Sequence, residues 1–202
     1  MEIRLPNDDD LVALARLAAD GVHDPAAMPF AVPWTDAPSP ALERSSLQWW
    51  WRLRAEWHPE NWTYSGAVFV DGEVVGVQDL AARSFAKLRS VVTGSWLGLA
   101  HQRQGLGQEM RAAALHLAFE GLGAAEALSG AWDDNLPSLG VSRKLGYVEN
   151  GTHLQLRRDA PGRHVGLRLS RDAWAERRRS DIEVLGLEPC LEMFGAAVPP
   201  AS

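Results

Sequence analysis

Apolar and polar residues alternate along several short stretches of the chain, a pattern typical of strands that bury one face. Residues 2–5 alternate in this way until Pro6. Asp71-Gly72 is predicted to form a hairpin turn, because both residues tolerate positive φ. The predicted strands cover residues 2–5, 65–70, 73–80, 90–99, 125–131, 147–157 and 165–170.

In other stretches the apolar residues recur every three or four positions, which predicts helices with one buried face. Asn7 or Asp8 is placed to cap the first helix. Its predicted buried residues are Leu11, Leu14, Ala15 and Ala18. A second helix is predicted over 40–56, where Trp49 and Trp50 are interpreted as packing residues. A third helix follows residues 101–107, and its predicted buried residues are Met110, Ala113, Ala114, Leu117 and Ala118.

The order of the elements is strand, helices, three strands, helix, strand, helix and strands, with short helices predicted at 135–144 and 172–179. This order predicts an α/β (α+β) single domain on one mostly antiparallel sheet, because strands and helices do not alternate as regular parallel units. The Pro- and Ala-rich residues 21–41 are predicted to form a long loop. The end of the chain, Gly195 to Ser202, is expected to fray.

The composition is ordinary for a soluble globular protein, with 46% hydrophobic and 23% charged residues among 202. No apolar run reaches the roughly 18 residues of a membrane span, and the residues after Met1 do not resemble a secretory signal. Cys190 is the single cysteine, so no internal disulfide can form. We therefore expect a cytoplasmic protein without a membrane partner.

The formal net charge of −6 argues against direct nucleic-acid binding, which needs a basic face to meet phosphates. The run Arg177-Arg178-Arg179 is a local exception and is interpreted as the solvated face of a late helix. We predict no metal site, and we expect no nucleic-acid partner.

Candidate chemistry centres on Gln102-Arg103-Gln104-Gly105-Leu106-Gly107, a segment that joins a predicted strand to a long amphipathic helix. Its two glycines let the backbone turn tightly and approach a ligand, and a helix N-terminus offers unpaired N–H groups with partial positive charge. Together these features form a cradle for a pyrophosphate. The segment lacks the Gly-Lys-Ser/Thr of a P-loop and the three glycines of a dinucleotide fingerprint. Glycines that only shape the turn remain the alternative interpretation.

A second block covers residues 135–147 and reads Asn-Leu-Pro-Ser-Leu-Gly-Val-Ser-Arg-Lys-Leu-Gly-Tyr. The Gln-x-x-Gly-x-Gly segment at 102–107 and this second block together resemble the acyltransferases of the GNAT (Gcn5-related N-acetyltransferase) superfamily. The resemblance spans residues 2–175 and is sharpest over 90–150. The Asn-x-x-Ser element and the late Trp174 are similar to the ribosomal-protein N-terminal acetyltransferase branch.

This resemblance implies a GNAT-like fold, in which a twisted sheet is splayed at the acyl-CoA site and flanked by helices. It also implies that an acetyl or other short acyl group passes directly from acyl-CoA to a primary amine in a ternary complex, without a metal. The implied coenzyme-binding residues are Trp96, Leu97, Gln102, Arg103, Gln104, Gly105, Leu106, Gly107, Gln108, Asn135 and Ser138. For Asn135, a helix cap is the alternative role.

The chain departs from the family pattern at one position. Many members carry a tyrosine that protonates the departing thiolate, and Ser142 stands there in this chain. Tyr147 falls at the aromatic position that packs in the core, so Ser138 is the preferred candidate for the catalytic acid, with water as the alternative. The general base is left open among Asp133, Asp134, His101, His116 and Glu149. The missing tyrosine keeps a non-catalytic acyl-CoA-binding or regulatory protein as the alternative function.

We expect residues 1–180 to form the acyl-CoA N-acyltransferase domain and residues 181–202 to form a C-terminal extension. An insert at 24–61 is expected on the acceptor side, because prolines limit its freedom and aromatic side chains provide contact area. Phe30 and Trp34 are its candidate acceptor-binding residues, with core packing as the alternative. The acceptor is left open between a small-molecule amine and a protein or peptide amine. The oligomeric state is also left open, a homo-oligomer included.

Overall fold

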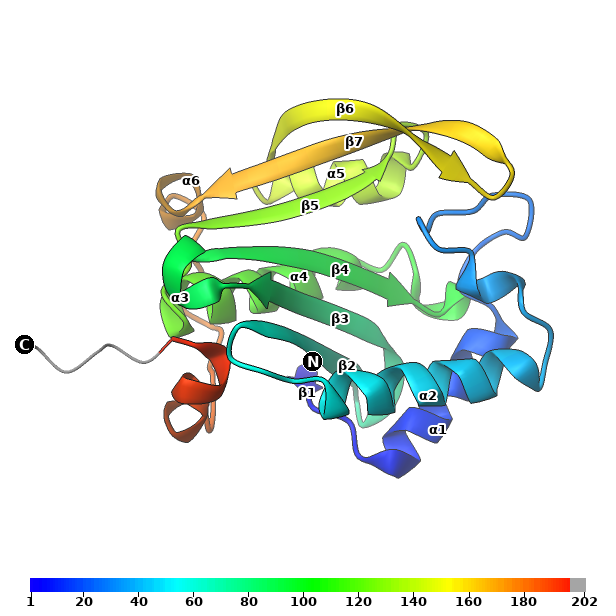
Figure 1. The fold of residues 1–202 in the computed structure, drawn as a ribbon, viewed down its shortest axis with the longest axis horizontal. Coiled ribbons are helices and arrows are strands. Elements are labelled where there is room, and N and C mark those ends of the chain that lie inside the picture. The colour runs from blue at the N-terminus through cyan, green and yellow to red at the C-terminus, as the bar shows by residue number, and fades with distance from the viewer. Residues whose placement is uncertain (197–202) are drawn as a thin grey trace, which may run out of the picture.

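The computed structural model of this protein describes residues 1–196 and shows one sheet with helices on both faces (Figure 1). Within these residues seven strands follow the order β1-β2-β3-β4-β5-β7-β6. They are β1 (Glu2–Arg4), β2 (Asn61–Val70), β3 (Glu73–Arg83), β4 (Ser90–Leu97), β5 (Glu126–Trp132), β6 (Val148–Arg157) and β7 (Ala160–Ser170). Neighbouring strands are antiparallel except β4 and β5, which run parallel. The predicted α/β fold on a mostly antiparallel sheet is therefore confirmed.

Two pairs of helices cover the two faces of the sheet (Figure 1). The helices are α1 (Asp8–Asp20) and α2 (Ala41–Ala55) on one face, and α4 (Leu106–His116) and α5 (Leu136–Lys144) on the other. Two short helices, α3 (Phe85–Leu88) and α6 (Arg171–Ala175), follow strand ends. Strand side chains alternate between the faces, so Val77 packs with α1 whereas Leu80, three residues on, packs with α4. None of the helices in the described part of the chain is long and apolar enough to cross a membrane.

The first two helices test the helical pattern directly. Asn7 caps α1, since its side chain accepts a hydrogen bond from the Asp10 N–H at 2.8 Å, and the Asp10 carboxylate accepts one from the Asn7 N–H at 2.9 Å. The predicted buried residues of α1 are confirmed. In α2, Trp50 is buried but Trp49 is 52% exposed, so the packing role predicted for Trp49 is wrong. Successive helix positions point about 100° apart, and only Trp50 faces the sheet.

Helix α4 buries a wider face than its pattern predicts. Met110, Ala114 and Ala118 are buried as expected. Ala113 and Leu117 are only half-buried, because they border a cavity beside the C-terminal segment. In their place Arg111, Ala112 and Leu115 are buried. The helix therefore presents a charged side chain, that of Arg111, to the protein interior.

The C-terminal segment packs against the sheet instead of fraying. A 3-10 helix, Glu188–Phe194, ends in Phe194, which is buried against Trp57 and Trp62. The indole N–H of Trp62 donates to the Phe194 carbonyl at 2.9 Å. Gly195 and Ala196 are only partly exposed or buried, so the expected fraying is wrong for them, and residues 197–202 lie outside the described residues.

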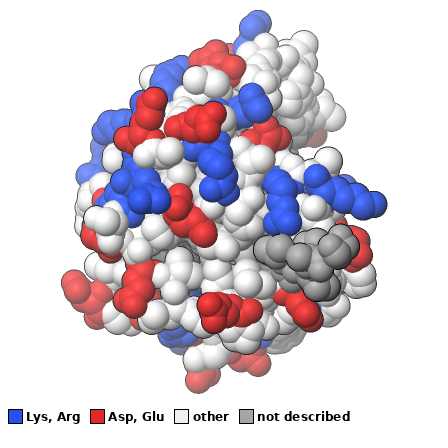
Figure 2. Space-filling view, turned by 90° about the vertical axis from the view of Figure 1, so that its left-hand side faces the viewer, with Lys and Arg blue, Asp and Glu red and all other residues white. Residues whose placement is uncertain are grey.

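The three consecutive arginines lie beyond α6, so the longer helix predicted to reach them is wrong. Arg177 pairs with Glu176, Arg178 with Glu120, and Arg179 with Glu109 and Asp181. Figure 2 shows the consequence at this end of the molecule, where basic and acidic side chains are interspersed. The run therefore does not form a basic patch.

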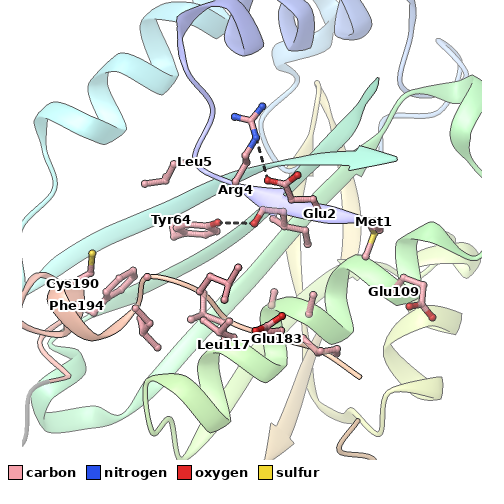
Figure 3. A pocket seen from close by; sticks show the side chains of 18 of the residues that line it. Met1, Glu2, Arg4, Leu5, Tyr64, Glu109, Leu117, Glu183, Cys190 and Phe194 are labelled. Atoms are coloured by element: carbon pink, nitrogen blue, oxygen red, sulfur yellow. Dashed lines mark hydrogen bonds and ion pairs between the residues drawn. The ribbon is translucent and has the colours of Figure 1, made fainter. Parts of the chain in front are cut away.

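A cavity of about 840 Å³ lies between the C-terminal segment, β1 and the outer side of α4 (Figure 3). Glu109 reaches it from α4, Leu117 reaches it from the π-helical turn Leu117–Gly121 that follows α4, and Phe194 and Cys190 reach it from the C-terminal segment. Its lining includes no residue of the segment 102–108 and neither Asn135 nor Ser138. The cavity is therefore separate from the residues that the sequence marks for coenzyme binding.

Candidate functional site

The segment between β4 and α4 has the backbone of an anion cradle. Arg103 and Gly105 both have positive φ, 61° and 85°, which turns successive peptide groups toward one side. The backbone N–H groups of residues 103–107 have no hydrogen-bond acceptor within the described chain. Helix α4 begins immediately afterwards, at Leu106, and adds the partial positive charge of its N-terminus. Consecutive free N–H groups of this kind bind phosphate oxygens.

The side chains of this segment have different roles. The Gln102 amide donates to the carbonyls of Val22 and Leu97, at 2.8 and 2.9 Å, so it ties the segment to the loop after α1 and to the end of β4. The Gln104 amide donates to the Ala100 carbonyl at 2.9 Å. These two side chains therefore fix the shape of the cradle, while its backbone N–H groups remain free.

Strands β4 and β5 diverge beside the cradle. Their parallel pairing covers Ser90↔Glu126 to Val92↔Leu128 and stops there. Thr93 and Ser129 then bridge the strands through side-chain hydrogen bonds of 3.4 Å to the Leu128 and Thr93 carbonyls. Beyond this point β4 continues to Leu97 without pairing to β5, so one edge of its backbone is open. Trp96 and Leu97, the predicted pantetheine contacts, lie on this open section.

Helix α5 lies behind the divergence and carries the second predicted block. Asn135 caps the helix, because its side-chain oxygen accepts a hydrogen bond from the Ser138 N–H at 3.2 Å. Ser138 is half-buried in the first turn, one turn before Ser142. The Ser142 hydroxyl is fully buried and donates to the Ser138 carbonyl at 3.1 Å. Val141 of α5 and Leu97 of β4 would each lie 3.9 Å from a Cβ at Gly107, so the cradle, the open strand and α5 adjoin one another.

A buried arginine that the sequence patterns did not mark lies in the same region. Arg111 of α4 is 5% exposed and donates to the Ser142 hydroxyl at 2.8 Å and to the Ser95 hydroxyl at 3.0 Å. It forms no ion pair within residues 1–196, and burial lowers its pKa. Tyr147, also buried, bonds Thr93 at 3.1 Å and occupies the core as predicted.

A second unmarked residue, Asp79, lies on the opposite face of the sheet. It pairs across the sheet with Ser65 on β2 and with Gly94 on β4. A Cβ at Gly94 would lie 3.8 Å from the Asp79 Oδ2, so the carboxylate borders the space that this glycine leaves. Burial raises the pKa of Asp79 to about 6, while a hydrogen bond from Ser65 acts to lower it. A carboxyl group that titrates near neutrality is suited to accept a proton.

Buried polar atoms without partners gather at this level of the sheet. The Oε1 of Gln78, the Oδ1 of Asp79 and the Nε of Arg111 have no hydrogen-bond partner in the described part of the molecule. Gln78 pairs across the sheet with Ser95, and Arg111 bonds the same serine. Gln78 and Arg111 lie on the α4 face and Asp79 lies on the other face. Because buried polar groups are usually satisfied, the unpaired atoms on each face indicate a place for a ligand or for water.

Aromatic side chains of the insert cover the α1–α2 face beside the divergence. The rings of Phe30 and Trp34 are 5.2 Å apart, and Trp34 lies 5.8 Å from the ring of Trp96 on β4. The indole N–H of Trp132 on β5 donates to the Phe30 carbonyl at 3.4 Å. The insert therefore spans from β4 to β5. Phe30 and Trp34 are half-buried, between a core position and an open surface.

The insert is held in place by the β6–β7 hairpin (Figure 1). Arg157 donates to the Met28 carbonyl at 2.6 Å, and Arg158 forms two hydrogen bonds with the Asp36 carboxylate at 2.7 and 2.8 Å. The 3-10 turn Trp34–Asp36 therefore has a fixed position over the sheet.

The acids and histidines considered for the general base lie elsewhere. The three acids are exposed and ion-paired: Asp133 with Arg163, Asp134 with Arg157 and Glu149 with Arg143. His116 ends α4, far along the helix from the cradle, and His101 precedes the cradle in a short 3-10 turn. Within residues 1–196, no group of three His, Cys, Asp or Glu side chains is arranged to hold a metal ion.

Comparisons with known proteins agree with this geometry. Residues 1–148 match the family model described as an acetyltransferase (GNAT) domain. A ribosomal-protein-alanine N-acetyltransferase from Brucella melitensis is similar at 20% identity and a TM-score of 0.63, over 84% of this chain and 99% of that one.

Two further solved structures are similar in fold. A putative acetyltransferase from Salmonella typhimurium, determined with its cofactor acetyl-CoA, is 20% identical with a TM-score of 0.62, over 85% of this chain and 94% of that one. A spermidine N-acetyltransferase variant from Vibrio cholerae is 13% identical with a TM-score of 0.67, over 89% of this chain and 100% of that one. At these identities the similarity concerns the fold.

Proposed function

Because this chain belongs to the GNAT acetyltransferase family, we propose that it transfers an acetyl or other short acyl group from acyl-CoA to a primary amine. The observation that carries the proposal is the cradle of five successive free N–H groups, residues 103–107, beside the diverging strands β4 and β5. Such a cradle suits a pyrophosphate. The open edge of β4 suits the amide groups of an extended pantetheine arm, as the family resemblance implies.

In this proposal the coenzyme pyrophosphate contacts residues 103–108, and Gln102 acts by holding the segment in shape. The pantetheine arm follows the open backbone of Trp96 and Leu97 and passes along the first turn of α5. Asn135 then contributes through the capped helix start as well as through its free amide, and Ser138 lies beside the arm. No metal takes part in the proposed reaction.

The proposed reaction is a direct attack by the amine on the thioester carbonyl. The nitrogen forms a C–N bond while the carbonyl electrons move to oxygen, where an N–H group on the open edge of β4 stabilises the charge. Collapse of this species breaks the C–S bond and leaves its electron pair on sulfur. Holding both substrates in attack geometry can lower the barrier by about 7–11 kcal/mol.

We propose Asp79 as the base that removes a proton from the amine. Its carboxylate lies on the α1–α2 face beside Gly94, with the aromatic insert over the same face. Its pKa of about 6 leaves it ionised at neutral pH and close enough to neutrality to accept a proton. Ser138, on the other face, remains the proposed hydrogen-bond donor to the departing sulfur.

The proposed acceptor is a primary amine that enters beside Phe30 and Trp34, on the side of the sheet opposite α5. The neighbouring structures named for spermidine and for ribosomal-protein alanine acetylation support an amine, since both names describe N-acetylation. The ion pair between Asp36 and Arg158 leaves the insert without a free carboxylate at that position. The aromatic rings are therefore the features proposed to contact the acceptor.

The test is release of free CoA from acetyl-CoA, and from other short acyl-CoAs, in the presence of a panel of amines. We expect release that depends on one class of primary amine and falls in a Ser138→Ala variant more than acetyl-CoA affinity does. The alternative function, a non-catalytic acyl-CoA-binding or regulatory protein, is favoured by Ser142 at the family tyrosine position. Tight acetyl-CoA binding without release by any amine would support that alternative and contradict the enzyme proposal.

A further inference from the structure

Within residues 1–196, Arg111 is a buried cation without a compensating carboxylate. Its side chain is 5% exposed, and its two terminal nitrogens bond neutral hydroxyl groups, Ser142 and Ser95. An arginine stays protonated even when it is buried. A buried charge without an opposite charge destabilises the folded protein. Its Nε–H also lacks a partner among the described residues. The site therefore has both a positive charge and a hydrogen-bond donor that no protein group uses.

The location of this charge is specific. Ser142 lies on α5 and Ser95 lies on the section of β4 that has left β5, so the guanidinium bridges the two sides of the opening. Ser142 also stands where many family members carry a tyrosine. A serine side chain is much shorter than a tyrosine side chain, and the Arg111 guanidinium reaches its hydroxyl from α4. A cation thus occupies the neighbourhood in which the family places its acid.

The titratable groups near Arg111 do not neutralise the charge of its guanidinium. Tyr147 is the titratable neighbour that interacts electrostatically with Arg111. Burial raises the pKa of Tyr147, so this phenol is neutral at ordinary pH and does not cancel the charge. The acid at the same level of the sheet, Asp79, belongs to the opposite face. An anionic ligand atom that enters the opening is therefore the natural partner of the guanidinium.

We infer that Arg111 is a further catalytic residue, which stabilises the CoA thiolate as it leaves the acyl group. The inference rests on the proposed function. When the C–S bond breaks, the electron pair stays on sulfur, and the guanidinium meets the new charge with its own charge and a free N–H group. The proton lost by the amine goes to Asp79 or to water, and solvent protonates the thiolate after release. Arg111 itself gives up no proton, because arginine remains protonated throughout.

This role explains why an enzyme of this fold can function without the tyrosine. A thiol titrates near about 8.5, so its thiolate needs only modest assistance to be a good leaving group near neutral pH. A neighbouring arginine lowers the pKa of a thiol to about 7.5 or below. Stabilisation by charge can therefore take the place of protonation by an acid.

The experiment measures the thiol pKa of CoA bound to the protein, from the ultraviolet absorbance of the thiolate across a pH series. Desulfo-CoA, which lacks the sulfur, serves as the blank. We expect a bound-thiol pKa at or below about 7.5 in the wild-type protein. Arg111→Met should raise it to about 8.5 or above, because the thiol then lies in an apolar place without a cation. Arg111→Lys and Ser142→Ala should keep it low, since both retain the charge.

Turnover gives a second readout. Arg111→Met should lower kcat by roughly a hundredfold or more, with acetyl-CoA affinity changed by only a few fold. Its melting temperature should stay the same or rise, because replacing an uncompensated buried charge with an apolar side chain is often neutral or stabilising. A bound-thiol pKa that is equal in the wild-type and Arg111→Met proteins would overturn the inference alone. Failure of the wild-type protein to bind CoA would overturn the proposed function and the inference together.

Discussion

At the residue scale, the two glycines of the cradle have different physical reasons to be glycine. Gly105 has a φ of 85°, which an L side chain adopts only with strain. Gly107 lies inside α4, and a Cβ there would make ordinary contacts of 3.9 Å with Leu97 and Val141. Nothing in the fold therefore requires a glycine at position 107. The proposed reason is the close approach of the pyrophosphate.

This distinction makes Gly107 the sharper test of the coenzyme site. Gly107→Asp should weaken acetyl-CoA binding by at least about tenfold more than Gly107→Asn, because the two side chains have nearly the same shape and only the first repels a phosphate. Calorimetric titration of both variants measures this difference, and their thermal melts should match. Equal affinities in the two variants would place the pyrophosphate elsewhere.

Asp79 links catalysis to pH. If it is the base, kcat/KM should rise with pH through an apparent pKa of about 6, as the carboxyl group ionises. Asp79→Asn should abolish that limb of the profile while leaving acetyl-CoA affinity unchanged, since the residue lies on the face opposite α5. The measurement is a pH–rate profile of both proteins with one amine. A profile that keeps the same limb in Asp79→Asn would exclude this carboxyl group.

Ionisation of Asp79 should lower the stability of the fold, whereas it is expected to raise the activity. The folded-state pKa of about 6 exceeds the unfolded value near 3.8, so the folded protein binds the proton more tightly and loses stability as pH rises from 3.8 to 6. At pH 7, Asp79→Asn should therefore increase the free energy of unfolding, by about 1–3 kcal/mol. Below pH 4 the difference should vanish. Urea unfolding of both proteins at pH 7 and below pH 4 measures this difference. If Asp79→Asn is instead less stable than the wild-type protein at pH 7, the carboxylate stabilises the fold.

The sequence marks site residues that are contiguous along the chain, but it does not mark those that only the fold brings together. The cradle residues are contiguous, so their pattern is visible along the chain. Arg111 is one charged position on the otherwise apolar buried face of α4, and Asp79 is one acid in a strand. Their importance depends on Ser142, Ser95 and Gly94, which come from other elements and meet them only in the fold. No local periodicity or motif in the sequence indicates such contacts between separate elements.

At the element scale, the alternation of apolar residues located every strand of the sheet but not all of their ends. Strand β2 begins at Asn61, ahead of the predicted start at 65, because its register with β3 continues through Trp62↔Ala82 to Asn61↔Arg83. The divergence of β4 from β5 also lies beyond local patterns. It follows from where the parallel register stops, after Val92↔Leu128, and from the Thr93 and Ser129 bridges that end it.

The aromatic insert is tested by removing the side chain of Trp34. Trp34→Ala should raise the KM of the amine by roughly tenfold, because the ring packs between Phe30 and Trp96 on the proposed acceptor face. Acetyl-CoA affinity should change little, since the cradle and α5 are separate elements. Trp49→Ala is the matched control, because this tryptophan is 52% exposed on α2 and outside the aromatic group. Two-substrate kinetics and thermal melts of both variants show whether Trp34 contacts the acceptor or only packs in the core.

A core-packing role for Trp34 predicts a different outcome. If Trp34 only packs in the core, Trp34→Ala should lower the melting temperature and reduce activity toward both substrates in proportion to the loss of folded protein. Kinetic constants corrected for the folded fraction would then equal those of the wild-type protein, and the acceptor assignment would be wrong.

At the scale of the whole molecule, the end of the C-terminal segment packs into the core. Phe194 and Ala196 belong to the same buried cluster as Trp62, Phe85 and Leu115. The sequence predicts a C-terminal extension from residue 181, where the apolar residues follow no regular pattern. A segment that contributes one large side chain and a few carbonyl groups leaves no such pattern to find.

Phe194 therefore tests whether the fold extends past residue 180. The side chain is 6% exposed and packs edge-on against Trp57 and Trp62, whose indole N–H groups donate to the Met193 and Phe194 carbonyls. Removing a buried phenylalanine costs about 3–5 kcal/mol, partly because the cavity it leaves does not collapse. Phe194→Ala should reduce the free energy of unfolding by this amount, measured by urea titration with tryptophan fluorescence.

Met193→Ala is the control for that measurement, since the side chain is 52% exposed in the same turn and its carbonyl is unaffected by the change. It should cost at most about 0.5 kcal/mol. The cradle lies at the other end of β4 from this segment (Figure 1), so acetyl-CoA affinity per folded molecule should stay unchanged in both variants. If Phe194→Ala costs no more than Met193→Ala, residues past 180 do not stabilise the domain. If it instead lowers affinity per folded molecule, the segment and the coenzyme site are coupled through α4, whose outer face the segment covers.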